Sequence, residues 1–422
     1  MTRRTALRRT AATVAVAVSI APTAAFAPAA TGDVALLSRD TGIAGAPAVG
    51  SSELNSPMLL STDGGRGVFA SPAKLLGAGD SQEDLFVRDA TAGTTVQVTL
   101  TAAGGQPDSE AAFPSIDGAG TRVVFQSSAQ NMAPGVTSNL QRIWVRDLTA
   151  NTTTLASSAP GGAAPDDQST NPSISRDGRY VSFTSFATNL TAVDPGTVAR
   201  SFRKDLQTGS VVLVSRASNG DEANGDGGKS QLSGDGRYVL FTSPATNLSP
   251  DDATSDRDLF LRDVTGGTTT LVNPDGDVQL PGAISDDGRW VAYRTAGAGG
   301  QVWVRDMVAG TPPTLVSATA AGDPATGGSP SEPSISADGR LIAFAAASAN
   351  LPDGSNSVVR NYVKDRVTGA IASAGPNDRS VLSLSGDGCF LHYPARNDTL
   401  SSGEVLPTDM SGFYAFRRRV GC

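Results

Sequence analysis

Two loops of the sequence carry closely spaced carboxylates of the kind that bind calcium. They offer Asp221, Glu222, Asn224 and Asp226 in "DEANGDGG", and Asp251, Asp252, Asp256 and Asp258 in "SPDDATSDRD". Ca²⁺ is held by clustered carboxylate and carbonyl oxygens, so either loop could contribute a site. In the first loop, however, Ser233 stands where an EF-hand would place its last glutamate. We favour a solvated polar loop at both places and keep bound Ca²⁺ as the alternative.

The sequence contains few residues suited to other kinds of catalysis. The chain has one histidine, His392, which any Ser-His-Asp triad would have to use. His392 stands at a mid-strand position of a repeat, and we interpret it as a packed residue. No G-x-S-x-G elbow occurs, and one His with two Cys nearly excludes zinc. Paired carboxylates could cleave a polysaccharide, but no pair is singled out, so we assign no catalytic residue.

A repeat of 49 to 58 residues sets the elements that must position these loops. Its turn glycines are Gly64, Gly120, Gly178, Gly236, Gly288, Gly339 and Gly388. A Leu or Ile stands four residues before each glycine and a Phe or Tyr five residues after it, and we expect all fourteen in the core. A third strand such as "LFLRD", a Thr-Gly turn and a Thr/Val-rich fourth strand follow. Four antiparallel strands per unit, repeated radially, predict a β-propeller.

The two ends of the chain predict how the ring closes. The segment "VALLSR", Val34 to Arg39, matches the fourth strand "VVLVSR", Val211 to Arg216, and the chain ends on a third-type strand, "FYAFRRR". The N-terminal strand should therefore complete the last blade and remove the exposed edges. The sequence predicts an all-β fold: a seven-bladed β-propeller of four-stranded antiparallel blades.

The motif "SISxDGRxxxF" followed by "xxVRDxxTG" resembles the TolB-like (PD40/WD40-like) propeller repeat of exported bacterial proteins. The resemblance covers almost the whole mature chain. TolB itself carries an extra α/β domain, and prolyl-oligopeptidase relatives carry a hydrolase domain. The chain has room for neither, so the activities of those relatives do not carry over.

Strand connectivity places the loops on two faces of the disc. The first and third turns of each blade are short and define the short-turn face, whereas the second connection and the blade-to-blade connection define the long-loop face. We expect function on the long-loop face, because variable loops on a rigid scaffold commonly build binding sites. Its nearest aromatic candidates for sugar binding are Phe113 and Phe186. The arginines of the "DGR" turns should instead pair with a neighbouring "RD" or "KD" aspartate: they are Arg179, Arg237, Arg289 and Arg340.

The N-terminus predicts export. Residues 1–30 combine an arginine-containing head, a short apolar stretch and small residues, as in a signal peptide of twin-arginine or ordinary secretory type, and 31–422 would form one propeller domain. No other apolar stretch is long enough for a transmembrane segment. Removing the four arginines of the head changes the net charge from −8 to −12, which argues against a nucleic-acid partner. We expect a monomer that is secreted or associated with a bacterial cell envelope.

The two cysteines, Cys389 and Cys422, predict a disulfide, since such bonds persist outside the cytosol. Cys389 opens the second strand of the last blade and Cys422 follows the third, so both fall at one edge of that blade. Two unpaired thiols are the alternative.

These observations leave two hypotheses for the function. The first is a non-enzymatic binding or scaffold module that holds an envelope or extracellular protein or glycan on the long-loop face. The second is a hydrolase or lyase acting on polysaccharide or peptide through acidic residues at the central channel. Two or more carboxylates converging at a channel mouth would favour the enzyme.

Overall fold

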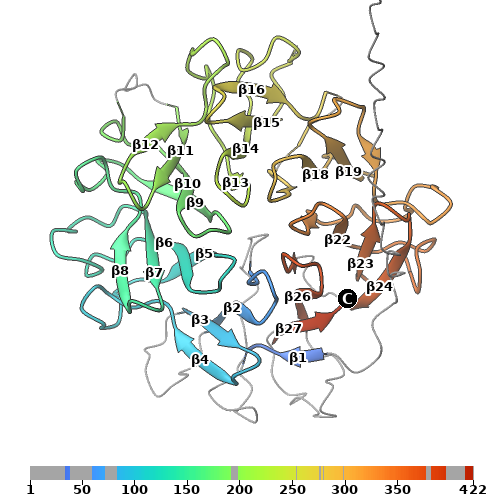
Figure 1. Ribbon diagram of the computed structural model, residues 1–422, viewed down its shortest axis with the longest axis horizontal. Helices are drawn as coiled ribbons and strands as arrows, with labels where there is room; N and C mark the ends of the chain where they lie inside the picture. The colour runs from blue at the N-terminus through green and yellow to red at the C-terminus, as the bar shows by residue number, and fades with distance from the viewer. Residues whose placement is uncertain are drawn as a thin grey trace, which may run out of the picture.

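The chain forms seven antiparallel sheets that stand around one axis like the blades of a propeller (Figure 1). The computed structural model describes residues 34–38, 59–71, 83–191, 198–252, 254–274, 277–278, 280–297, 299–376, 382–395 and 414–421. The all-β, seven-bladed fold is confirmed. The predicted signal, residues 1–30, lies outside the described residues. Within the described part of the chain, no helix is long and apolar enough to cross a membrane.

The blades are numbered in chain order, and Figure 1 shows the first strands β5, β9 and β13 on the side of their blades that faces the axis. Blade 1 contains β2 (Arg66–Ser71), β3 (Asp84–Asp89) and β4 (Thr94–Gln97). Blade 2 contains β5 (Ala111–Ile116), β6 (Arg122–Ser127), β7 (Arg142–Asp147) and β8 (Thr152–Leu155). Blade 3 contains β9 (Ser169–Ile174), β10 (Tyr180–Ser185), β11 (Arg200–Asp205) and β12 (Val211–Leu213). Blade 4 contains β13 (Ser230–Leu232), β14 (Tyr238–Ser243), β15 (Asp258–Asp263) and β16 (Thr268–Leu271).

The remaining blades follow the same plan. Blade 5 contains β17 (Ala283–Ile284), β18 (Trp290–Arg294), β19 (Val302–Asp306) and β20 (Thr314–Leu315). Blade 6 contains β21 (Ser334–Ile335), β22 (Leu341–Ala346), β23 (Arg360–Asp365) and β24 (Ile371–Pro376). Blade 7 contains β25 (Ser383–Leu384), β26 (Phe390–Ala395), β27 (Tyr414–Arg419) and β1 (Val34–Leu36).

The N-terminal strand closes the ring, as predicted. β1 pairs antiparallel with β27, with Val34 opposite Arg418 and Leu36 opposite Phe416. Beyond the strand, the Leu37 N–H donates to the Ala415 carbonyl at 2.8 Å. The first described residues therefore supply the outermost strand of the last blade.

Blade 1 departs from the four-stranded prediction, because its inner strand is reduced to a bridge between Leu60 and Gly67. The Val68 N–H donates to the Leu59 carbonyl at 2.9 Å, so the pairing continues as far as Leu59. Gly67 stands where the other blades carry Val, Ile or Leu. A Cβ on Gly67 would lie 2.7 Å from Leu37, so the residue after β1 fills this space.

The predicted core is confirmed. All fourteen repeat residues are buried, the most exposed being Ile284 at 7%. In five blades the Phe or Tyr of the second strand also packs against an aromatic ring of the third, as between Phe183 and Phe202, whose ring centroids are 5.9 Å apart. Such cross-strand pairs fill the gap between neighbouring sheets and hold the blades at a fixed spacing.

The turn glycine is needed for two reasons. At Gly236 the backbone has φ +67°, a conformation that disfavours side chains. A Cβ there would also lie 2.4 Å from Tyr180 of the preceding blade. The same contact recurs between Gly288 and Tyr238, so the first turns interlock around the ring.

Candidate functional site: the two ends of the central channel

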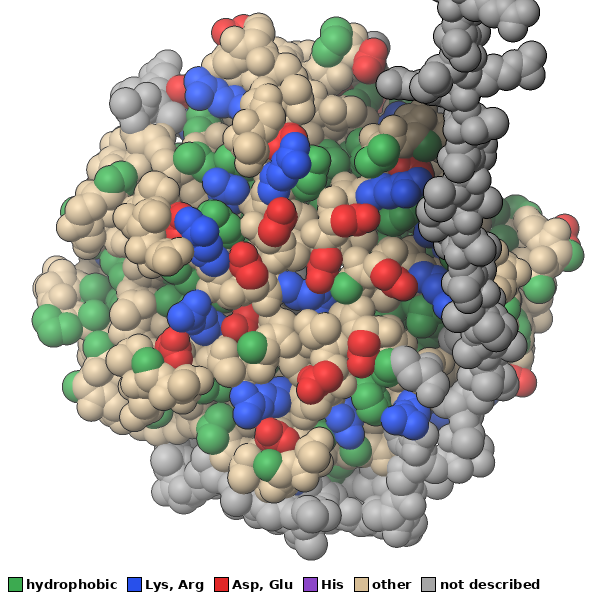
Figure 2. Space-filling model, viewed as in Figure 1, with side chains coloured by type: hydrophobic (Ala, Val, Ile, Leu, Met, Phe, Trp, Pro, Cys, Tyr) green, Lys and Arg blue, Asp and Glu red, His purple; other side chains and the backbone are tan. Residues whose placement is uncertain are grey.

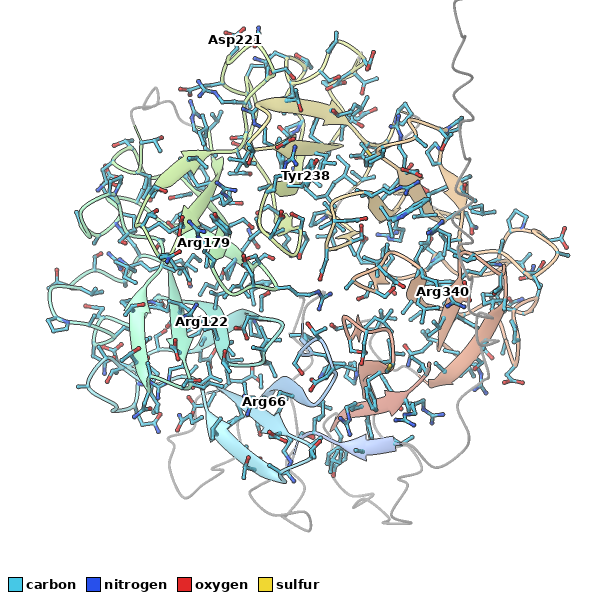
Figure 3. All side chains as sticks on the ribbon, viewed as in Figure 1. Arg66, Arg122, Arg179, Asp221, Tyr238 and Arg340 are labelled. Atoms are coloured by element: carbon cyan, nitrogen blue, oxygen red, sulfur yellow. The ribbon has the colours of Figure 1, made fainter. Side chains whose placement is uncertain are left out.

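The "DGR" arginines form ion pairs on the short-turn face, as predicted. In six blades an Arg before or at the start of the second strand meets an Asp that ends the third, with N–O distances of 2.6 to 3.2 Å. Figure 3 shows Arg66, Arg122, Arg179 and Arg340 on one circle around the centre. Hydrogen bonds from Arg289 lower the pKa of Asp306 to about 2. These arginines therefore stabilise their own blades. In blade 7, Cys389 stands at the position of the arginine.

The Arg or Lys before each of these aspartates has a structural role as well. Lys204 Nζ donates to the Ser158 carbonyl of the preceding blade at 2.7 Å. In blade 6, Lys364 Nζ donates to the Thr319 carbonyl of blade 5 at 3.1 Å. These cations link neighbouring blades through hydrogen bonds whose donor carries a charge, which are stronger than neutral ones.

Seven backbone hydrogen bonds encircle the channel at the short-turn face, and we call them the hydrogen-bond ring. They join the first turns of neighbouring blades with donor–acceptor distances of 2.7 to 3.0 Å. The donors and acceptors are Thr62 to Gly118, Gly118 to Arg176, Asp177 to Gly234, Gly234 to Asp286, Asp286 to Ala337, Ala337 to Gly386, and Asp387 to Thr62. Because the last bond returns to the first residue, the ring is continuous and narrows the channel.

The Arg176 side chain crosses the space inside this ring. Its Nε lies 2.6 Å from Asp286 Oδ1, which joins blade 3 to blade 5. A Cβ on Gly386 would lie 2.7 Å from Arg176 Nη1, so the guanidinium also lies against blade 7. Behind the pair is a cavity of ≈ 20 Å³, room for about one water, lined in part by Gln231 and Ser334. Figure 2 shows a basic side chain at the centre of this face with acidic side chains around it.

At the long-loop end of the channel, side chains from separate blades converge. Lys229 Nζ, from blade 4, lies 5.0 Å from the centroid of the Phe113 ring in blade 2. Arg294 Nε, in blade 5, donates to Glu332 Oε1 of blade 6 at 2.9 Å. Burial lowers the pKa of Lys229, while the charge of Glu332 opposes this change. We call Phe113, Lys229, Arg294 and Glu332 the channel cluster.

The channel cluster is incompletely paired. Glu332 Oε2 is buried and has no hydrogen-bond partner among the described residues. Burial raises the pKa of Glu332, whereas the hydrogen bond from Arg294 and the charges of Arg294 and Lys229 lower it. Phe113 has φ +52°, a strained conformation for a bulky residue. The strain is located at β5, where the pairing with β6 shifts register.

The first acidic loop uses its side chains within the fold. Glu222 Oε2 accepts from Arg200 Nη2 at 2.9 Å, and Asp226 Oδ1 accepts from the Ala199 N–H at 2.8 Å. Asn224 Oδ1 accepts from the Thr246 N–H at 2.9 Å. Asp221 lies at the outer rim of the disc (Figure 3). The four residues therefore have separate local contacts.

The second acidic loop contains one strongly perturbed carboxyl group. Asp258 is 5% exposed, and burial raises its pKa to about 6, with Asp252 and Asp256 adding to the effect. Asn273 Nδ2 donates to it at 2.8 Å. For Asp251, the contact within the described part of the chain is a hydrogen bond from its N–H to Ser249 Oγ at 3.3 Å.

No three His, Cys, Asp or Glu side chains in the described ranges form a group that could hold a metal ion. Bound Ca²⁺ at either loop stays a prediction, which thermal unfolding with and without millimolar calcium would test.

His392 is a packed residue, 1% exposed, on β26. Neither ring nitrogen has a hydrogen-bond partner among the described residues, and burial lowers its pKa to about 4. The other aromatic named for sugar binding, Phe186, is 39% exposed and follows β10 on the long-loop side.

Of the two cysteines in the predicted disulfide, the structure describes Cys389, whereas Cys422 lies outside the described residues. The Val420 and Gly421 N–H groups donate to the Cys389 carbonyl at 2.7 and 3.3 Å. The chain after β27 therefore continues beside Cys389 up to the residue before Cys422. The disulfide stays a prediction that this placement supports.

Sequence reasoning missed both ends of the channel. The short-turn end had a signal: between the Ser and Asp of the first turn most blades carry Gly, Ala or Thr, so Arg176 and Asp286 stand out. The channel cluster had none, since Lys229 and Glu332 lie in segments whose composition matches the other long connections.

Solved structures with similar folds include TolB from Acinetobacter baumannii, with 14% identity, a TM-score of 0.42 and coverage of 80% of this chain and 76% of that chain. The β-propeller domain of the Trilobed protease from Pyrococcus furiosus, which has an open velcro topology, has 10% identity, a TM-score of 0.49 and coverage of 85% of this chain and 94% of that chain. A putative TolB from Agrobacterium tumefaciens has 13% identity, a TM-score of 0.40 and coverage of 78% of this chain and 95% of that chain. At these identities the likeness is one of fold. Neither the protein-family models nor the curated proteins give a match to this chain.

Proposed function

We propose that this chain is an exported, non-enzymatic β-propeller that binds a protein or glycan of the cell envelope or its surroundings through its long-loop face. The supporting observation is the difference between the two ends of the channel. The hydrogen-bond ring and the Arg176–Asp286 pair occupy the short-turn end. The charges of the channel cluster are at the long-loop end, so a ligand would approach from that face.

The makeup of the channel cluster favours binding over hydrolysis. Among the described inner-strand residues at its level, Phe113, Asn171, Lys229, Pro281 and Glu332, there is one carboxylate. Glycoside hydrolysis commonly needs two carboxylates about 5 to 9 Å apart across the scissile bond. The described residues at the long-loop end of the channel do not supply such a pair.

A pull-down of envelope proteins and glycans, with residues 31–422 as bait, tests the proposal. Two exposed hydrophobic residues give matched variants on opposite faces: Phe186 on the long-loop side and Val308 in the third turn of blade 5, which are 39% and 76% exposed. We expect Phe186→Ser to weaken capture of a partner and Val308→Ser to preserve it. Capture that only Val308→Ser abolishes would place the binding face on the opposite side, and no specific capture would contradict the proposal.

A further inference from the structure

The channel cluster holds two partly buried charges that lack full hydrogen bonding to the described residues. Glu332 has one oxygen paired with Arg294 and one without a partner in the described part of the chain. Lys229 Nζ contacts the Phe113 ring and forms no hydrogen bond to the described residues. Burying a charged group without full hydrogen bonding is costly. Charges kept in such a state inside a channel indicate a site that a ligand completes.

A hydroxyl-bearing ligand suits these two groups better than a simple ion. An anion would satisfy Lys229 but would be repelled by Glu332, and a cation would meet the reverse problem at Lys229 and Arg294. A hydroxyl group both donates and accepts, so it can donate to Glu332 Oε2 while its oxygen accepts from Lys229 Nζ. Neighbouring hydroxyls on one sugar ring provide two such groups at a fixed spacing.

Phe113 supplies the apolar part of the site. Its ring is already in contact with the Lys229 ammonium, and it comes from the opposite side of the channel cluster from Glu332. An aromatic ring beside hydrogen-bonding groups suits a molecule that has both polar and apolar surfaces, as a pyranose has.

We propose that the channel cluster binds a neutral saccharide unit, with its hydroxyls between Lys229 and Glu332 and its C–H face against Phe113. This inference rests on the proposed function and narrows its ligand class to a glycan. The Arg294 ion pair would position the Glu332 carboxylate, and the hydrogen-bond ring would end the site at the far side of the channel.

Titration calorimetry with residues 31–422 tests this inference. The probes are glucose, galactose, mannose and N-acetylglucosamine, each as the monosaccharide and as a linear trisaccharide. We expect at least one saccharide to bind, and Glu332→Gln and Lys229→Met each to weaken its Kd by about tenfold or more. Glu110→Gln is the matched control, because Glu110 is exposed, lies three residues before Phe113 and loses the same charge.

Thermal unfolding of each variant shows whether it is folded, and Phe113→Leu replaces any variant that is not. Binding by none of the saccharides, or binding that the three site variants leave unchanged, would overturn the inference. Binding of acetate or methylammonium in place of sugars would show that the site takes a simple ion and would also overturn it. If the pull-down captures a protein while no saccharide binds, this inference fails and the proposed function stands.

Discussion

Arg176 Nε lies 2.6 Å from Asp286 Oδ1, although the two residues belong to blades that are not neighbours. The pair joins blade 3 to blade 5, and the backbones of both residues belong to the hydrogen-bond ring. Its side chains are 10% and 36% exposed, so it is partly screened by solvent. The contact distinguishes the two ends of the channel, on which the proposed function depends.

Removing this pair should loosen the short-turn end. We expect a double-mutant cycle of Arg176→Met and Asp286→Asn to give a coupling energy of about 0.5 to 1 kcal/mol, and the amides of the hydrogen-bond ring to exchange faster with solvent. Arg237→Met is the control, because its pair with Asp263 lies within one blade and is 45% exposed on the arginine side. Ring amides that exchange at the parent rate in Arg176→Met would show that the pair does not hold this end closed.

Deleting residues 32–39 should open the propeller. The deletion removes β1 and exposes the edge of β27 with the apolar residues beside it, so the protein should aggregate or melt well below the parent. Leu36→Asp should reproduce much of this effect, because Leu36 is 6% exposed, whereas Ala35→Asp on the other side of the strand should do less. An unchanged melting temperature after the deletion would rule out a stabilising role for β1.

His392 should make the protein sensitive to acid. Burial lowers its folded-state pKa to about 4, below the unfolded value near 6.5, so the unfolded chain gains the proton first. Stability should therefore fall as pH drops from 6.5 towards 4, by about 3 kcal/mol at most.

His392→Leu should remove this pH dependence, since Leu240 already stands at the corresponding position of blade 4. Chemical denaturation of both proteins at pH 7 and pH 5 measures the difference. Parallel losses in the parent and the variant would assign the acid sensitivity to other groups.

Asp258 should have the opposite effect. Burial, with Asp252 and Asp256 nearby, raises its folded-state pKa to about 6, above the unfolded value near 3.9, so the ionised form destabilises the fold above pH 6. Asp258→Asn should then raise the melting temperature at pH 8 and change it little at pH 4. An Asn here still accepts the hydrogen bond from Asn273. A loss of stability at pH 8 would show that the charge is needed, as it would be at a cation site.

The predicted disulfide between Cys389 and Cys422 can be tested by intact mass. Non-reducing alkylation of the mature protein should add no alkyl group, whereas reduction should allow two to be added. Chain entropy for a loop of this size predicts that reduction costs roughly 3 to 4 kcal/mol of stability. Two alkyl groups added without reductant would show free thiols, and Cys389→Ser with an unchanged melting temperature would remove any structural role.

The fold could be predicted from the sequence because the spacing of residues within each repeat defines the strands and their order. The spacing of the turn glycine, the Ile or Leu before it and the Phe or Tyr after it predicted seven blades, and "VALLSR" predicted the closing strand. The shortened inner strand of blade 1 could not be predicted, because the space at Gly67 is filled by Leu37, a residue from a different part of the chain.

The site was less predictable because it depends on contacts across the axis. Arg176 meets Asp286 from 110 residues away, and Lys229 meets Phe113 across an intervening blade. No local spacing encodes such contacts. For the acidic loops, composition alone left bound Ca²⁺ as an alternative to a solvated loop. In the first loop, Glu222, Asn224 and Asp226 form hydrogen bonds within the fold.

The pairing of β1 with β27 also orders the steps of folding. Ser38 and Ala415, which hydrogen-bond beside this pairing, are 377 residues apart, so one partner is synthesised long before the other. Six blades can form from contiguous segments as the chain grows, but the seventh must wait for the last strand. Contacts of such long sequence separation slow folding, because a long loop must close before they form. A growing chain would therefore keep β1 unpaired until β27 has been synthesised, and a chain truncated before β27 would not complete the ring.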